Sequence, residues 1–581
     1  MAQPSPIIRL DDVSFSYGAS ATPALDHVSL CIAPGEFVGV IGPSGAGKST
    51  LAAALSGAIP HHYRGQLFGA VTVDGSDTCE VTLTDISRVV GSINQDIDAQ
   101  MVASVVEDEL LFGLENFGVP HDQIPDRLAS ALETVGIADL REREIATLSG
   151  GQKQKVAIAA MLALRPRVLV LDEPTAALDP VSSSTVFETL RALNRDAGIT
   201  VVVIEQKVAL LCEHCDRIVV MDRGRVAFDG TPRSVFSHGR NLRALGVDSP
   251  RVARISNSLA EHGVIEPGAP CLSVAEARDL VADLVRGQAA GEKNAAAGTP
   301  AKPRPALPAD PVVSFRDVSF AYPGSRATVE HLSFDARPGE IVGVVGQNGA
   351  GKTTLTKLLN GLLKPASGEV LVAGLDTRDT PTSRLAAHVS TLFQNPDRQL
   401  CKDTVLDEVA FGLELTGVGA GEARERARSV AERFGLPLDA APFSLSRGQR
   451  QMVALASVVV MEPEVVLLDE PTSGLDYREC MTVMETVREM AEKGCAVVMV
   501  CHDMEVVSDF AERVIVMADG RILGQGPADQ VFADAGLMAR ADVEAPQVVR
   551  LAAELARDVS PAFAGASQVS DIVDTVEGML K

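Results

Sequence analysis

The sequence contains one set of motifs twice, and this duplication constrains the fold more than any other feature. GPSGAGKST at residues 42–50 recurs as GQNGAGKTT at 346–354. VLVLDEPTAALD at 168–179 recurs as VVLLDEPTSGLD at 465–476. Because the motifs keep their order and nearly keep their spacing, the chain is predicted to fold as two tandem domains of one architecture.

Each repeat also has its own C-terminal segment, since VDSPRVARI at 247–255 matches VEAPQVVRL at 543–551. Inside each repeat, short β-branched runs alternate with longer helical stretches, which predicts an α/β fold with a mainly buried sheet. A stretch rich in Ala, Pro and Gly separates the repeats and is typical of a linker. The predicted division is a first repeat (1–235), its C-terminal extension (236–286), the linker (287–311), a second repeat (312–530) and its extension (531–581).

The composition argues against several classes of protein. The formal net charge is −25, which gives no support to a nucleic-acid-binding surface. Nine scattered cysteines are not the framework of a disulfide-rich secreted domain, so we expect a reducing cytosol. The first residues lack the pattern of a signal peptide. No run of about eighteen apolar residues is present, so we expect any membrane role to come through a partner.

Both copies of the first motif match the P-loop pattern. Each follows an apolar strand and opens a helix, and this context favours a phosphate-binding loop over a structural glycine turn. Backbone N–H groups of the loop and the helix N-terminus would surround phosphate oxygens. Lys48 and Lys352 would neutralise the β- and γ-phosphates, and the hydroxyls of Ser49 and Thr353 would face Mg²⁺.

A pair of acidic residues ends the strand of the second motif in each repeat. Asp172 and Asp469 are expected to hold Mg²⁺, directly or through water. Glu173 and Glu470 follow, where a carboxylate could orient or deprotonate the water that attacks the γ-phosphate. The alternative is a carboxylate that only caps a helix, and it does not explain the same Asp-Glu-Pro-Thr sequence in both repeats.

LSGGQ at 148–152 and LSRGQ at 445–449 each stand directly before a helical stretch. Ser149 and Ser446 could simply cap those helices. The other interpretation is that the serine hydroxyl and the loop amides form a second anion site. Because each repeat has one P-loop, this second site would meet a nucleotide that is held elsewhere.

Taken in order, the P-loop, the LSGGQ-type signature, the LDEPT strand end and the residue after the next strand resemble the nucleotide-binding domain of ABC transporters. The resemblance covers nearly the whole chain, twice. It implies an ATPase that binds ATP and Mg²⁺ and drives transport through separate membrane subunits. It also implies that the two halves form an intramolecular dimer, in which each ATP lies between the P-loop of one half and the signature of the other.

The resemblance assigns roles to further positions. Tyr17 and Tyr322 match the aromatic residue that stacks on adenine. Gln95 and Gln394 match the glutamine that touches Mg²⁺ and the attacking water and senses the membrane partner. The remaining implied residues are the ATP contacts Gly42, Ser44, Gly45, Gly47, Thr50, Gly346, Asn348, Gly349, Gly351 and Thr354, the signature residues Gly150, Gly151, Gln152, Arg447, Gly448 and Gln449, and Asp179 and Asp476 of the loop that communicates across the dimer.

The switch position differs between the repeats. VVVIEQKVALL at 201–211 aligns with VVMVCHDMEVV at 497–507, so Gln206 lies opposite His502. In the family, a histidine here contacts the γ-phosphate. Glutamine can donate a hydrogen bond to phosphate, but it cannot carry a positive charge.

Two residues depart from the family pattern, Gln206 at the switch position and Arg447 in the signature. Both belong to the same predicted composite site. There Gln206 and the first P-loop would face LSRGQ, in which Arg447 replaces a glycine. The second P-loop, Glu470 and His502 would face the complete signature around Ser149. We therefore expect the His502 site to perform most of the hydrolysis and the Gln206 site to bind ATP and turn over slowly. The alternative is that both sites hydrolyse ATP well.

The segments around the two predicted glutamines resemble the ATPases of energy-coupling factor (ECF) importers, in which fused double ATPases occur. FQNPDRQL at 393–400 fits well, and INQDIDAQM at 93–101 fits more loosely. The resemblance implies a peripheral protein on the cytoplasmic face of the membrane, a transmembrane coupling subunit, and a membrane subunit that captures a vitamin or a transition-metal ion. Two alternatives are the fused ATPase of another importer, such as a sugar importer, and a soluble ABC protein acting on ribosomes or DNA.

Overall fold

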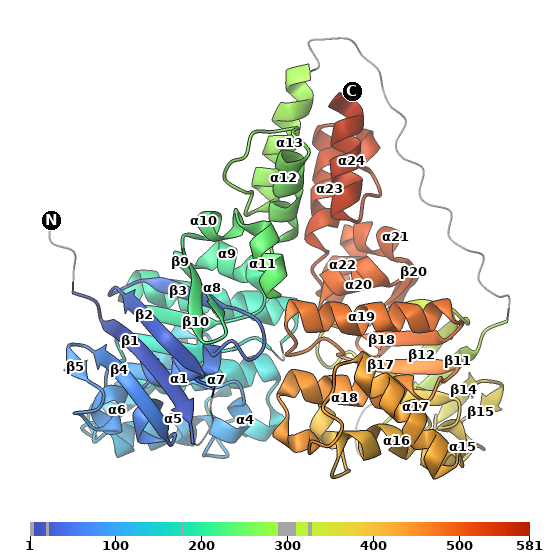
Figure 1. Ribbon diagram of the computed structural model, residues 1–581, viewed down its shortest axis with the longest axis horizontal. Coiled ribbons are helices and arrows are strands. Elements are labelled where there is room, and N and C mark those ends of the chain that lie inside the picture. The colour runs from blue at the N-terminus through green and yellow to red at the C-terminus, as the bar shows by residue number, and fades with distance from the viewer. Residues whose placement is uncertain (1–4, 19–21, 177, 289–309, 324–327, 581) are drawn as a thin grey trace. The chain divides into compact units, whose positions relative to one another are not determined.

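The computed structural model describes residues 5–18, 22–176, 178–288, 310–323 and 328–580. It divides into two compact units, Met1–Ser273 and Val274–Lys581, and Figure 1 labels their elements. Most of the predicted linker, 287–311, lies outside the described residues. None of the helices in the described ranges has both the length and the apolar character that crossing a bilayer requires.

The first unit is built on a six-stranded sheet with the strand order β10-β9-β3-β8-β7-β6. Only β10 runs antiparallel to its neighbour. β3 and β8 are buried at every residue, as expected for parallel strands that are covered on both faces. The strands are β3 (Phe37–Ile41), β6 (Val90–Ile93), β7 (Val168–Asp172), β8 (Thr200–Ile204), β9 (Arg217–Asp222) and β10 (Arg225–Gly230).

A four-stranded antiparallel sheet, in the order β2-β1-β4-β5, covers one face of this central sheet. Its strands alternate buried and exposed residues, since only one face meets the core. Val28 of β2 packs in the same core as Val38 and Val202 of the central sheet. The strands are β1 (Ile8–Tyr17), β2 (Leu25–Ile32), β4 (Gly65–Val73) and β5 (Ser76–Asp77).

Helices cover the other face of the central sheet, and α5, α6 and α7 pack against one another as a helical subdomain. Strands and helices thus form layers around the P-loop, which confirms the predicted α/β fold. The helices are α1 (Lys48–Leu55), α2 (Ala58–His61), α3 (Leu83–Ser87), α4 (Ile97–Gln100), α5 (Val106–Asn116), α6 (Ile124–Thr134), η1 (Ala138–Leu140), η2 (Ile145–Thr147), α7 (Gly150–Ala163), α8 (Pro180–Ala197), α9 (Val208–His214), α10 (Pro232–Phe236), α11 (Gly239–Leu245) and α12 (Arg251–Glu261).

The second unit repeats both sheets, with the orders β12-β11-β14-β15 and β16-β17-β18-β13-β19-β20. Its strands are β11 (Val313–Phe320), β12 (Val329–Ala336), β13 (Ile341–Val345), β14 (Ser367–Val372), β15 (Leu375–Asp376), β16 (Val389–Leu392), β17 (Val465–Asp469), β18 (Ala496–Val500), β19 (Arg513–Ala518) and β20 (Arg521–Pro527). The matching strand orders confirm that the duplicated sequence folds twice into one architecture.

The helices of the second unit follow the same order along the chain as those of the first. They are α14 (Lys352–Leu359), α15 (Thr382–Leu385), η3 (Pro396–Arg398), α16 (Val405–Leu415), α17 (Ala420–Arg433), η4 (Pro442–Ser444), α18 (Arg447–Val459), α19 (Tyr477–Glu492), α20 (Met504–Phe510), α21 (Ala528–Ala533), α22 (Ala535–Ala541), α23 (Gln547–Asp558), η5 (Pro561–Phe563) and α24 (Val569–Leu580).

One helix belongs to a different unit from the one that the repeat suggests. The predicted extension 236–286 ends in α13 (Val274–Gln288), and α13 packs in the second unit against α23 and α24 (Figure 1). Its buried face includes Val281, which is fully inaccessible to solvent. Arg278 of α13 forms an ion pair of 3.4 Å with Glu554 of α23. The division between the compact units therefore falls between Ser273 and Val274, inside the predicted extension.

Candidate functional site

The first predicted P-loop joins β3 to α1 and wraps around the ammonium group of Lys48. Lys48 Nζ donates hydrogen bonds of 2.8 Å to the carbonyl oxygens of Gly42 and Pro43. Gly42 has φ 154°, and a Cβ there would overlap the carbonyl oxygen of Met221 on β9. Only glycine therefore lets the loop pass this close to the sheet, which places a nearly buried positive charge at the end of β3.

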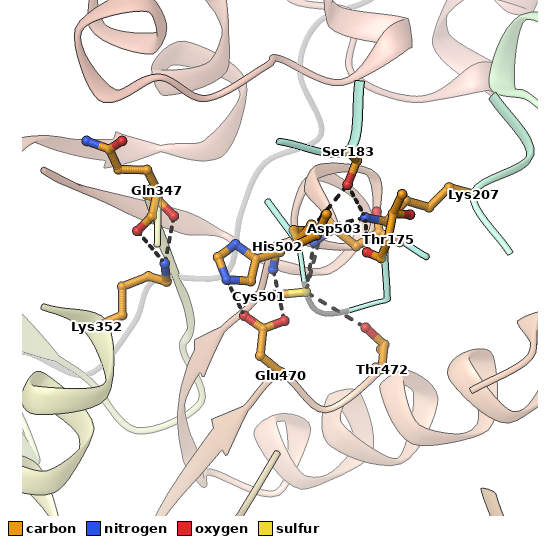
Figure 2. Close-up of polar contacts among 12 residues, drawn as sticks. Thr175, Ser183, Lys207, Gln347, Lys352, Glu470, Thr472, Cys501, His502 and Asp503 are labelled. Carbon is orange, nitrogen blue, oxygen red and sulfur yellow. Dashed lines mark hydrogen bonds and ion pairs between the residues drawn. The ribbon is translucent and has the colours of Figure 1, made fainter. Parts of the chain in front are cut away.

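The second P-loop has the same construction. Lys352 Nζ donates to the carbonyl oxygens of Gly346, at 2.6 Å, and Gln347, at 2.9 Å (Figure 2). Gly346 has φ 151° and lies against the carbonyl of Met517 on β19. The exposed tips of the two loops present the remaining predicted contacts Ser44 and Gly45 in one unit and Asn348 and Gly349 in the other.

The structure brings together two of the predicted magnesium ligands in the first unit. Ser49, at the start of α1, hydrogen-bonds the carboxylate of Asp172 at the end of β7. Burial raises the pKa of the Asp172 carboxyl, and the Ser49 hydroxyl and the charge of Lys48 partly oppose this effect. A hydroxyl and a half-buried carboxylate beside a phosphate loop are oxygen ligands of the type that Mg²⁺ prefers, so these residues fit the ion.

Asp469 occupies the equivalent place at the end of β17. Burial raises the pKa of its carboxyl as well, and the positive charge of Lys352 acts in the opposite direction. A half-buried carboxylate with a raised pKa is stabilised in its charged form when a cation binds beside it. Both strand ends are therefore suited to a cation.

Two amide groups hold the carboxylate of Glu173. Gln95 Nε2 donates to one oxygen at 2.6 Å, and Gln206 Nε2 donates to the other at 2.7 Å. The pKa of Glu173 is raised, first by burial and then by the neighbouring Glu205. Glu173 thus contacts both Gln95, which the sequence predicts near the attacking water, and Gln206, which it predicts near the γ-phosphate.

Glu470 pairs with the switch histidine in the second unit. His502 Nε2 lies 3.1 Å from one carboxylate oxygen, and the backbone N–H of His502 donates to the other at 3.2 Å (Figure 2). Gln394, the counterpart of Gln95, is exposed on its loop. The two predicted catalytic carboxylates therefore differ in their donors and in the length of the contacts.

The backbone at both glutamates has the same unusual conformation. Glu173 has φ 48° and Glu470 has φ 52°, in the left-handed region that non-glycine residues rarely adopt. The N–H of each glutamate donates at 2.9 Å to the last residue of the adjacent strand, Ile204 in one unit and Val500 in the other. Strained residues of this kind are concentrated at functional sites, and here the strain aims the carboxylate beyond the strand end.

Lys207 holds the loop that follows the predicted catalytic carboxylate of the first unit. Its ammonium group donates to the carbonyl oxygens of Thr175, at 3.0 Å, and Leu178, at 3.1 Å, and to the Ser183 hydroxyl, at 2.8 Å (Figure 2). The loop leads to Asp179, which caps α8 by accepting a hydrogen bond from the next turn. A single side chain thus links the segment after β8 to the loop between β7 and α8.

Glu205 completes this network on the other side of the switch residue. It is 2% exposed and accepts a short hydrogen bond from the hydroxyl of Thr175. It also accepts a bond of 2.8 Å from the backbone N–H of Gln206. A buried carboxylate with several donors is stable in this position because its desolvation is offset by charge-assisted hydrogen bonds.

The second unit lacks these two side chains, since Cys501 and Asp503 stand in place of Glu205 and Lys207. Asp503 instead caps α20 and accepts a hydrogen bond of 3.0 Å from the N–H of Glu505. Sequence reasoning missed the role of Glu205 and Lys207. Alignment of the two repeats could have indicated it, because the charges of Glu205 and Lys207 are not kept at Cys501 and Asp503.

The signature serines cap helices, which was one of the two interpretations of the sequence. Ser149 begins α7 and forms reciprocal hydrogen bonds with Gln152, of 3.3 and 3.0 Å. Ser446 and Gln449 do the same for α18. Both serines are exposed, so the cap leaves the helix N-termini accessible to an anion.

Arg447 has a neighbour that explains how the second signature accepts a long side chain. It follows Ser446 in the first turn of α18, and its guanidinium lies against Gly474 in the loop after β17. The next signature residue, Gly448, is buried against the Glu479 side chain and has no space for a Cβ. The arginine therefore lies along the surface of its own unit, and Gly448 keeps the helix close to α19.

A second glutamine supports each predicted glutamine loop. Gln100 Oε1 accepts from the N–H of Asn94 at 2.9 Å, directly before Gln95. In the second unit, Gln399 Oε1 accepts from the N–H of Phe393 at 3.4 Å. The final glutamine of the pattern thus fixes the backbone of the loop, although the first loop matches the pattern loosely.

Comparison with known proteins agrees with this geometry. The ABC transporter family model matches residues 25–176 and 329–473. The chain is 34% identical over 565 residues to an ABC transporter ATP-binding protein of Caldanaerobacter subterraneus, covering 95% of this chain and 96% of that protein. It is 36% identical over 557 residues to one from Methanosarcina acetivorans, covering 95% and 91%.

A third relative has a more specific name. The chain is 33% identical over 546 residues to YkoD of Bacillus subtilis, which is named as an HMP/thiamine import ATP-binding protein, covering 93% of this chain and 95% of that protein. The repeated motifs, the two P-loops and these full-length matches lead to one assignment. The chain belongs to the ABC transporter family and is an ATPase that uses ATP with Mg²⁺ in two tandem ATP-binding domains.

Proposed function

We propose that this ATPase is the energy-supplying subunit of an ECF importer and drives the uptake of a vitamin or a transition-metal ion. The observation that carries the proposal is the match to a protein named for HMP/thiamine import, which extends over both repeats. The FQNPDRQL segment and the paired C-terminal extensions support the same subgroup. The protein would lie at the cytoplasmic face of the membrane, as a peripheral subunit.

In this proposal the two halves close head to tail around two ATP molecules. The P-loop at Lys352 would be completed by the signature at Ser149, and the P-loop at Lys48 by the signature at Ser446. Exposed, capped helix N-termini at both serines support this arrangement, because they offer N–H groups to a phosphate. Fusion in one chain would raise the effective concentration of each half for the other.

The hydroxyls of Ser49 and Thr353 and the carboxylates of Asp172 and Asp469 would hold Mg²⁺, with Gln95 and Gln394 near it. The ion would supply positive charge that stabilises the phosphate oxygens. The lysines of the P-loops would bind the β- and γ-phosphates.

Hydrolysis would proceed mainly at the site with Glu470 and His502. Glu470 would orient the attacking water and accept its proton, and His502 would donate a hydrogen bond to the γ-phosphate. At the other site, Glu173 is held between the amides of Gln95 and Gln206 by short bonds, which favours retention of ATP over turnover.

Membrane subunits would dock where the glutamine loops reach the surface. Phe393 is exposed beside Gln394, and Asp96 and Asn395 cap short helices in the two loops. An exposed aromatic residue next to a polar loop is suited to receive a helix of a partner. Closure of the two halves on ATP would then move the membrane subunits.

The proposal is tested by purifying tagged protein from detergent-solubilised membranes and identifying its partners and any bound small molecule by mass. We expect a transmembrane coupling protein and a small membrane subunit that carries a vitamin or a metal ion. A Phe393→Asp variant should lose these partners but retain ATP binding, whereas Phe443→Asp, at an exposed phenylalanine outside the loop, should retain both.

Other partners would contradict the proposal. Purification of the chain with membrane subunits that bind a sugar would favour another importer of the same family. Recovery with ribosomes or DNA, and without membrane protein, would favour a soluble ABC protein. Uptake of the identified molecule into cells should also stop when Glu470 is replaced by Gln.

A further inference from the structure

Two exposed tyrosines form a corner beside the first P-loop. Tyr17, at the end of β1, is 37% exposed, and its hydroxyl lies 3.2 Å from the Thr50 hydroxyl in the first turn of α1. Tyr63, in the loop between α2 and β4, is 43% exposed. The two ring centroids are 5.8 Å apart, and the rings are nearly perpendicular, at 89°. Both rings offer open aromatic surface next to a loop that binds phosphate.

The backbone holds Tyr63 in place at both ends of its loop. Its N–H donates to the carbonyl of Ala58 at 3.1 Å, and the carbonyl of Arg64 accepts from the N–H of Gly18 at 3.2 Å. His61 Nε2 lies 2.8 Å from the carbonyl of Thr78. The residues HHYR at 61–64 are exposed, yet these three hydrogen bonds hold their loop to the rest of the domain. These bonds fix the backbone at Tyr63, and its ring contacts those of Tyr17 and His62 edge-on.

We propose that Tyr63 is a second contact for the adenine base in the first ATP site. The inference rests on the proposed role of Tyr17 as the first contact. Perpendicular aromatic walls suit a planar base, which can stack on one ring and present its edge to the other. Stacking of a base on an aromatic side chain typically changes affinity about 5- to 150-fold.

The second repeat builds this region differently. The segment between α14 and β14, NGLLKPA at 360–366, is shorter and contains no aromatic residue. Lys364 Nζ instead donates at 3.0 Å to the carbonyl of Thr380. Tyr322 keeps the edge-on contact with Phe320, at 5.1 Å, that Tyr17 makes with Phe15 at 4.9 Å. The additional aromatic wall is therefore specific to the first site, where we also propose that ATP is retained.

The test measures each site separately in the full-length protein. Lys352→Ala disables the second P-loop, so equilibrium binding then reports the first site, and Lys48→Ala gives the reverse background. In the Lys352→Ala background, Tyr63→Ala should weaken ATP binding about 5- to 150-fold, and Tyr63→Phe should leave it nearly unchanged. In the Lys48→Ala background, Tyr63→Ala should have no effect.

Inorganic triphosphate provides the decisive control, because it has no base. Its affinity for the first site should be the same with and without the Tyr63 ring. Unchanged ATP affinity in Tyr63→Ala would overturn the proposal, and so would an equal loss of ATP and triphosphate affinity, since the residue would then be structural. The assay needs no membrane partner, so its result is distinct from a failure of the ECF assignment.

Discussion

Replacing the two predicted catalytic glutamates one at a time should have very different effects. Glu173 accepts amide hydrogen bonds of 2.6 and 2.7 Å, whereas the contacts to Glu470 are 3.1 and 3.2 Å. The first pair is at the short end of the range for N–H···O bonds, and the second is at the long end. Each of these hydrogen bonds stabilises the charged carboxylate and weakens when the carboxylate accepts a proton from water.

The expected magnitude follows from the strength of those bonds. A hydrogen bond to a charged group contributes about 1.5–3 kcal/mol, so losing one such bond as Glu173 accepts a proton should slow its site about 10- to 150-fold. The two contacts from His502 to Glu470 are longer and therefore weaker, so losing one of these two costs less than losing a bond to Glu173. The first site would then provide at most about one tenth of the total turnover.

Steady-state phosphate release at saturating ATP and Mg²⁺ measures the difference. Glu470→Gln should lower kcat about 10- to 150-fold, while Glu173→Gln should leave about nine tenths of it. Equilibrium ATP binding serves as the control, because both variants should still bind two ATP molecules. Equal losses of kcat in the two variants, or a larger loss in Glu173→Gln, would refute the link between these contacts and turnover.

Three other changes test the site at the level of single groups. Lys207→Met removes the ammonium group that holds the loop before α8, so hydrogen exchange at the Leu178 amide should accelerate at least about tenfold, as measured by mass spectrometry or NMR. Gly42→Ala should reduce ATP stoichiometry from two to one per chain in equilibrium binding, because a Cβ would overlap the Met221 carbonyl. Asp172→Asn should raise Tm at about pH 8 without Mg²⁺, since burial raises the pKa of this carboxyl and disfavours its charged form. By calorimetry, the gain should shrink as the pH falls through that raised pKa, where the native carboxyl becomes protonated.

The parts of the site that could be predicted from the sequence are those whose chemistry requires a fixed local spacing. A lysine that reaches phosphates from a glycine loop must stand at the start of the helix that follows, so Lys48 and Lys352 can be recognised in the sequence. The acids at 172 and 469 are visible because they end strands that the apolar pattern marks. The α/β fold follows from the same alternation of short apolar runs and helices.

The parts that could not be predicted depend on contacts between distant segments. Gln95 and Glu173 are 78 residues apart, and only the folded sheet brings their side chains together. Glu205 and Lys207 flank the switch residue, yet charged residues after a strand are usually exposed, so nothing local predicts that Glu205 is buried and Lys207 half-buried. Tyr63 lies in a polar loop whose backbone hydrogen bonds have no sequence pattern.

The packing of α13 also affects how the two halves could be produced separately. The repeat suggests dividing the chain in the linker. The helix α13 would then be part of the first polypeptide, although its buried face packs against α23 and α24 of the second unit. Two polypeptides divided in the linker would still associate, because α13 of the first would pack against α23 and α24 of the second. They should therefore elute together in size-exclusion chromatography. Division after Ser273 would instead give each product a complete set of its own packing partners, and this is the boundary to choose for isolated halves.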